Sequence, residues 1–107
     1  MGTVGLYTGD EELIRLAFDA PLGIVDQVRQ GVTESRFWYE GSIHYNCFTL
    51  EAFLNQLLFA RLYHKEIPQD VERTIYEMML APCKMAFSNS VLPNPNDGWP
   101  NLNLKTY

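Results

Sequence analysis

The chain has 107 residues, of which 47% are hydrophobic, and its 13 acidic and 8 basic residues give a formal net charge of −5. This length predicts a single domain with enough apolar side chains to fill a core. Nucleic-acid binding is disfavoured because the few lysines and arginines are not clustered, as contacts to phosphates require. The acidic surface instead suits a protein partner with a basic surface, since complementary charges speed the encounter.

The sequence also argues against export and membrane insertion. No basic segment followed by an apolar run indicates a signal peptide, and no apolar run reaches the roughly 20 residues that a membrane span needs. We therefore expect a cytoplasmic protein without membrane contact, in which the two cysteines are reduced.

The N-terminal region predicts one strand and two short helices. Residues 3–8 alternate weakly between apolar and polar side chains, as a short strand does. Asp10 suits a helix N-cap, because a carboxylate can accept hydrogen bonds from the free amides of the first turn. This first helix should end near Pro21, and a second helix should run from Leu22 to a C-terminal cap at Gly31.

Residues 35–48 change to a period of two, which predicts a β-hairpin. The apolar residues at alternate positions are Phe37, Tyr39, Ile43, Tyr45 and Cys47. A two-residue loop at Glu40-Gly41 would pair Phe37 with His44, whereas a three-residue loop places all the apolar side chains on one face. We prefer the longer loop, although the glycine of such loops usually comes last and Gly41 is in the middle.

Residues 49–82 predict two helices folded back on each other. Thr49 suits the N-cap of the first helix, and Pro68 suits the start of the second, where its missing N–H costs nothing. Spacings of three and four residues place apolar side chains on one face of each helix. These side chains are Leu50, Phe53, Leu54, Leu57, Leu58 and Leu62, followed by Val71, Ile75, Met78 and Met79. We expect both faces to be buried and this helical hairpin to carry the stability.

Together these elements predict an α+β fold. A small antiparallel sheet, formed by the N-terminal strand and the β-hairpin, would pack one face against the helical hairpin, with the two short helices beside it. The globular domain would cover residues 1–90. Residues 91–107, rich in proline and asparagine, would form an extended tail whose last residues could add a strand to this sheet or to a partner's. A homo-oligomer could form through the tail or the helical hairpin.

No catalytic or cofactor motif is present. The sequence lacks a glycine-rich phosphate loop and the motifs of serine hydrolases and zinc proteases, which favours a non-enzymatic role without a cofactor. Zinc could be bound by His44, Cys47, His64 and Cys83, but His64 would lie about 20 Å along its helix from the others. Because a structural zinc site needs four ligands, we predict no bound metal.

The outward face of the predicted β-hairpin is the best candidate for a binding surface. The three-residue loop places Trp38 opposite His44, with Arg36 on the same face. Tryptophan and arginine are enriched in binding hot spots, so these three residues form one candidate site. If another element covers this face, Trp38 is instead a core residue, and the sequence leaves both alternatives open.

Two further residues are candidates for binding. Arg61 falls within the apolar stripe of the first long helix, where it either extends into solvent or, as a buried cation, could hold an anionic group. Trp99 lies between Gly98 and Pro100 and is a second aromatic anchor, which either docks the tail on its own domain or inserts into a partner.

The sequence therefore predicts a small acidic protein-interaction module. An inhibitor, an immunity protein or an anti-defence protein that occludes a partner fits the size, the charge and the lack of a catalytic motif. The alternative is a small-ligand or nucleotide-binding protein, with a phosphodiesterase among the options, that uses Trp38, His44 and Arg61.

Overall fold

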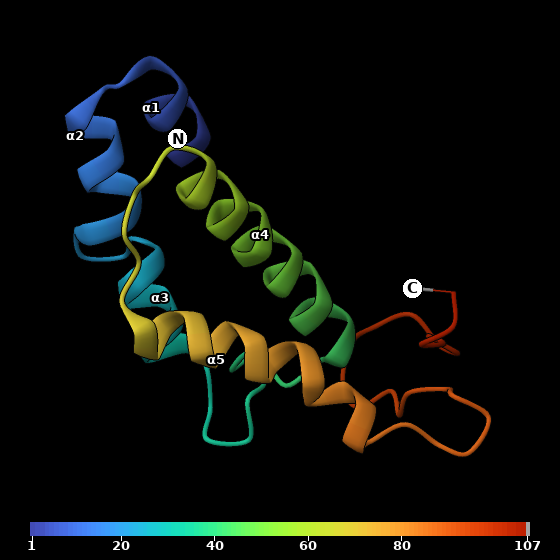
Figure 1. Ribbon diagram of the computed structural model, residues 1–107. Coiled ribbons are helices and arrows are strands. Elements are labelled where there is room, and N and C mark those ends of the chain that lie inside the picture. The colour runs from blue at the N-terminus through green and yellow to red at the C-terminus, as the bar shows by residue number, and fades with distance from the viewer. Residues whose placement is uncertain (107) are drawn as a thin grey trace.

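The computed structural model describes residues 1–106, which are mainly helical (Figure 1). The α-helices are α1 (Gly2–Thr8), α2 (Glu11–Ile14), α3 (Ile24–Gly31), α4 (Ile43–Leu62) and α5 (Gln69–Leu80). A π-helical turn, η1 (Arg15–Asp19), continues α2, and a 3-10 turn, η2 (Pro82–Lys84), follows α5. The predicted α+β fold is wrong, because residues 1–106 contain no sheet and only two isolated β-bridges.

The predicted N-terminal strand is the helix α1. It ends at Gly9, whose φ of 72° is the left-handed conformation that favours glycine in a helix C-cap. Asp10 caps α2 as predicted, and its side chain accepts hydrogen bonds from the N–H groups of Glu12 and Leu13. Gly5 lies where α1 crosses α2 closely, since a Cβ on Gly5 would be 2.9 Å from the Cβ of Leu13.

The predicted β-hairpin is replaced by an earlier chain reversal and the start of α4. The chain turns back at residues 33–37, where the N–H of Thr33 donates to the carbonyl of Phe37 over 2.9 Å. Val32 and Trp38 form an isolated antiparallel bridge across this turn. Ser42, and not Thr49, is the N-cap of α4, and its Oγ accepts a hydrogen bond from the N–H of Tyr45. The second predicted strand therefore belongs to a 20-residue helix.

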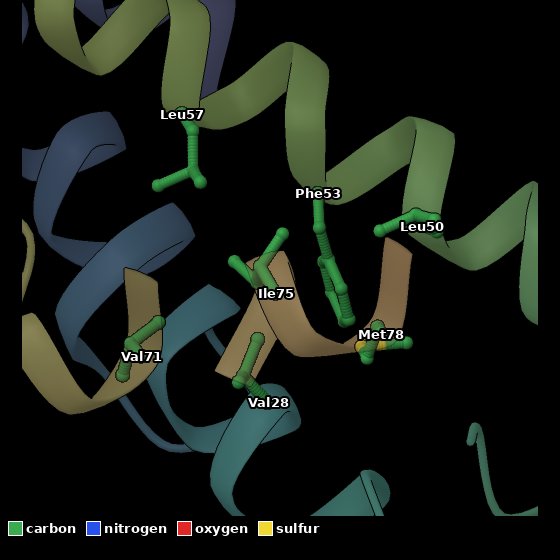
Figure 2. Packing of buried hydrophobic residues seen from close by; sticks show 7 residues of the cluster. All are labelled: Val28, Leu50, Phe53, Leu57, Val71, Ile75 and Met78. Carbon is green, nitrogen blue, oxygen red and sulfur yellow. The ribbon is translucent and has the colours of Figure 1, made fainter. Parts of the chain in front are cut away.

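The main core joins α3, α4 and α5, so the two long helices do pack on each other as predicted. Figure 2 shows its seven buried side chains: Val28, Leu50, Phe53, Leu57, Val71, Ile75 and Met78. Pro68 directly precedes α5 and is its N-cap. A smaller cluster of Leu6, Phe18 and Ala60 connects α1 and η1 to the C-terminal half of α4.

The buried faces are narrower than the sequence predicted. Leu54, Leu58 and Leu62 on α4 and Met79 on α5 were expected in the core, but all four side chains are exposed. The reason is that α4 is apolar on more than one side, while α3 and α5 cover only one side of it (Figure 1). Leu54, Leu58 and Met79 lie along the outer edge of the contact between α4 and α5.

Residues 91–106 run back past the start of α4. Leu92 is buried, and its N–H donates to the carbonyl of Leu102 over 2.8 Å. The side chain of Asn96 donates to the carbonyl of Gly41, and the Tyr45 hydroxyl donates to Asp97. The predicted last strand does not form within the described residues, which have only a single bridge between residues 91 and 103 here. Tyr107, the end of the predicted tail, lies outside the described residues.

Residues 1–106 include no helix that combines the length and the apolar character needed to cross a lipid bilayer.

Candidate functional site

The structure does not bring the five predicted binding residues together. Trp38 lies beside α3, Arg36 contacts α5, and His44 lies with Trp99 at the start of α4. Arg61 is 17 residues further along the same helix as His44, which separates the two by about 25 Å at 1.5 Å per residue. Arg36, Trp38 and His44 therefore do not share one exposed face, as the predicted hairpin required.

Trp38 packs against the main core. Its ring meets Phe53 edge-on at a centroid distance of 5.9 Å, and its backbone N–H donates to the Oδ1 of buried Asn46 over 2.8 Å. The ring also lies directly on Gly31, where any Cβ would overlap it. Trp38 is half-buried, so one part of its ring completes the core and another part remains at the surface.

Arg36 holds the turn of residues 33–37 against α5. Its Nε lies 2.5 Å from the Oε2 of Glu77, and its φ of 66° is in the left-handed region. A residue other than glycine adopts this conformation at some cost in energy, so the ion pair helps to fix the shape of the turn. The structure thus gives Arg36 an intramolecular partner.

His44 and Trp99 form a stacked pair with a centroid distance of 5.1 Å and an interplanar angle of 22°. His44 is buried, and its ring also meets the edge of Phe48. Trp99 is 72% exposed, so it covers His44 with one face and leaves much of its surface in solvent. Of the two alternatives for Trp99, the structure shows the tail docked on its own domain.

Arg61 extends into solvent, which is the first of its two alternatives. Its side chain is 71% exposed, and its Nη2 lies 3.6 Å from the Oε1 of Glu72 on α5. An exposed pair at this separation contributes little to stability, about 0–1 kcal/mol.

Residues 1–106 contain no group of three or more His, Cys, Asp or Glu side chains that is placed to hold a metal ion. We predict less than about 0.1 zinc per chain after purification without chelator, because zinc sites in proteins need three or four protein ligands. Elemental analysis of the purified chain measures this ratio. Stoichiometric zinc that is lost when Cys47 or Cys83 is replaced would contradict the prediction.

A hollow of about 530 Å³ opens beside Trp38, between α3 and the chain that returns from the turn. Its lining residues are Leu22, Asp26, Gln27, Gln30, Gly31, Trp38 and Tyr39. Trp38 and Tyr39 form an aromatic pair with a centroid distance of 5.0 Å, and Tyr39 is 65% exposed. We call this hollow the α3 pocket.

One wall of the α3 pocket is held in an unusual backbone conformation. Leu22 has a φ of 64° although it is not a glycine, and its side chain is exposed. The N–H of Leu22 donates to Asp26 over 2.9 Å, and its carbonyl accepts from the side chain of Gln27 over 2.6 Å. Side chains that line the pocket therefore fix the position of this wall.

Asp26 places a carboxylate in the α3 pocket. Its hydrogen bonds come from the N–H of Leu22 and the side-chain amide of Gln30, which are neutral donors. Among residues 1–106, the five ion pairs do not include Asp26. The neighbouring Arg29 is bound to Asp70, and this hydrogen bond is the main cause of its raised pKa, to which the charge of Asp26 adds less. The pocket thus combines two aromatic rings with a carboxylate that forms no direct ion pair among residues 1–106.

Sequence reasoning selected Trp38 but missed the other residues of the α3 pocket. Asp26 and Gln30 are four residues apart on α3, so they share one face of this helix, and Asp26 also binds the N–H of Leu22 before it. This spacing alone does not predict a pocket, because the pocket forms only when the chain reverses at residues 33–37 and brings Trp38 and Tyr39 back to that face. The sequence pattern had placed the reversal at residues 40–42 instead.

Comparisons with models of protein families, with curated proteins and with solved structures found no match.

Proposed function

We propose that this chain is a small acidic protein-interaction module that occludes a partner protein with a basic surface, as an inhibitor, an immunity protein or an anti-defence protein does. The α3 pocket is the contact, and it receives an arginine or lysine side chain of the partner. A cytoplasmic location is part of this proposal. The observation that carries it is the Trp38–Tyr39 pair beside the carboxylate of Asp26, which forms none of the five ion pairs among residues 1–106.

Each part of the α3 pocket suits a cationic side chain. The faces of tryptophan and tyrosine attract a cation within about 6 Å, which contributes about 0.5–2 kcal/mol. A carboxylate adds a charge-assisted hydrogen bond, and with arginine this contact can be bidentate. The side-chain nitrogens of Gln27 and Gln30 bind Leu22 and Asp26, which leaves their amide oxygens to accept hydrogen bonds from the partner's backbone.

The pocket is also rigid before the partner arrives. Gly31 and Phe53 fix the ring of Trp38, and two hydrogen bonds fix the wall at Leu22. Binding then orders few side chains, so more of the interaction energy appears as affinity. The net charge of −5 on the whole chain supports the same partner, because it speeds the approach of a basic surface.

The alternative nucleotide or phosphodiesterase site has no comparable support. Trp38, His44 and Arg61 lie in three different places, and the ring of His44 is covered by Trp99. We therefore propose one function.

The test uses a short peptide with a single arginine and a matched peptide with neutral citrulline in its place. In a titration followed by NMR, the arginine peptide should shift the indole signal of Trp38 and bind at least about tenfold more tightly than the citrulline peptide. Asp26→Asn and Tyr39→Ala should each weaken arginine binding by about tenfold. The asparagine of the first variant keeps an oxygen that can accept the hydrogen bond from Leu22, so the wall should stay in place.

The controls are Glu11→Gln and Tyr7→Ala, which change an exposed carboxylate and an exposed aromatic ring away from the pocket. Both should bind the arginine peptide as the parent does. Equal binding of the two peptides, or an unchanged affinity in Asp26→Asn, would overturn the proposal.

A further inference from the structure

The edge of the α4–α5 contact carries an apolar groove that faces solvent. One hollow of about 220 Å³ is lined by Leu54, Leu58, Tyr76 and Met79 on its outer side, with Arg61 and Glu72 at its rim. A second hollow of about 570 Å³ shares Leu54 and Met79 with the first, so the two form one continuous groove. It is separate from the α3 pocket, which has none of these lining residues.

The amount of apolar surface in this groove is large for a small chain. Leu58 is 54% exposed and Tyr76 is 57% exposed, and Leu54 and Met79, which line the same hollow, are also exposed. Contiguous apolar patches larger than a few hundred Å² are rare on monomeric proteins and mark interaction sites. A stable interface of standard size buries about 800 Å² on each partner, and it has an apolar centre with a polar rim.

The charges on α4 indicate what covers the groove. Glu51, Leu54, Leu58 and Arg61 follow one another at spacings of three, four and three residues, so all four lie on one face of the helix. The spacings are symmetric about the midpoint between Leu54 and Leu58, and both of these residues are apolar. The residues at the two ends, Glu51 and Arg61, carry opposite charges. Such a stripe is complementary to itself when two copies of the helix run antiparallel.

We propose that a second copy of this chain covers the groove, through an antiparallel contact between the two α4 helices about a twofold axis between Leu54 and Leu58. Leu54 of one copy then packs against Leu58 of the other, and Glu51 of one copy pairs with Arg61 of the other. Each contact occurs twice, as the symmetry of such an interface requires. Tyr76 and Met79 of the two α5 helices flank this apolar centre.

The intramolecular contacts leave these groups available. Arg61 is 71% exposed, and its separation of 3.6 Å from Glu72 is longer than a direct hydrogen bond. Glu51 is exposed and forms none of the five ion pairs among residues 1–106. The dimer therefore adds ion pairs at the rim without breaking the packing of the single chain.

Charge reversal tests this arrangement directly. Sedimentation velocity of the full chain across a concentration range that brackets a micromolar Kd should show a dimer that dissociates on dilution. Arg61→Glu and Glu51→Arg should each weaken the dimer at least about tenfold, because each places two pairs of like charges opposite one another. The double variant Glu51→Arg/Arg61→Glu should recover to within about threefold of the parent, since the pairs are restored with exchanged signs.

A monomeric parent chain at every concentration would overturn the proposal, as would a double variant that is no better than the single ones. Circular dichroism of each variant checks that it is folded, and Leu58→Asp gives a second route to the monomer if a charge variant fails to fold. A control with Glu11→Arg changes the net charge by the same amount as Glu51→Arg away from the groove and should leave the dimer intact. The result does not depend on the peptide titration, which probes the α3 pocket.

Discussion

Replacing Trp38 by alanine should lower the free energy of unfolding by up to about 3–5 kcal/mol, the range for removing a large aromatic side chain from a core, because the buried part of the ring completes the core. The ring lies on Gly31 and meets Phe53, so its removal leaves a cavity between α3 and α4. Against a total stability of about 5–15 kcal/mol, this loss is severe. Urea denaturation followed by circular dichroism measures it.

Trp99→Ala is the matched control, because it removes the same side chain from an exposed position. It should cost less than about 1 kcal/mol, as substitutions on the surface usually do. A Trp38→Ala variant as stable as the parent would show that its ring does not pack against the core. That result would also remove the rigid aromatic wall on which the α3 pocket depends.

Truncating the centre of the main core should have a similarly large effect. Ile75→Ala and Leu57→Ala should each cost about 2–5 kcal/mol, because both side chains are buried where α4 meets α5 (Figure 2). The measurement is again chemical denaturation, with the midpoint and the slope fitted separately.

Val4→Ala on the exposed face of α1 serves as the control for these two variants and should stay within about 0.5 kcal/mol of the parent. If both core variants unfolded at the same urea concentration as the parent, the packing of α4 on α5 shown in Figure 2 would be incorrect.

Local signals in the sequence predicted several helix boundaries correctly. Asp10 caps α2 and Pro68 precedes α5, because each of these residues acts through its own backbone or side chain. Gly31, predicted as the C-terminal cap of α3, is instead the last residue of this helix, and Val32 is the cap. Val71, Ile75 and Met78 were predicted as buried and are buried, since they share the face of α5 that packs on the core.

The failure at residues 35–48 has a physical cause. The apolar residues at positions 37–47 fit a strand, but Ile43, Asn46 and Leu50 also fit the buried side of a helix that begins at Ser42. The helical choice is favoured because it continues into Phe53 and Leu57 without a break and buries all of these side chains on one side. This burial requires α3 and α5 to pack against α4, and the periodicity of a short segment does not predict that packing.

The same limitation affected the candidate site. The pairing of Trp38 with Tyr39 and Asp26 depends on contacts between the returning chain and α3, not on neighbours in the sequence. Exposure of Leu58 and Leu62 was missed because α4 has more apolar sides than its neighbours can cover. The helical period predicts which residues share a face, but it does not predict how many faces other elements cover.

The close contact between Gly31 and Trp38 also limits how this chain can diverge. A Cβ at position 31 would overlap the indole ring, so a larger residue there is compatible only with a smaller side chain at position 38. Each substitution alone should be harmful, the first by overpacking and the second by leaving a cavity. In any set of related sequences, these two positions should therefore vary together, with glycine at the first whenever tryptophan occupies the second.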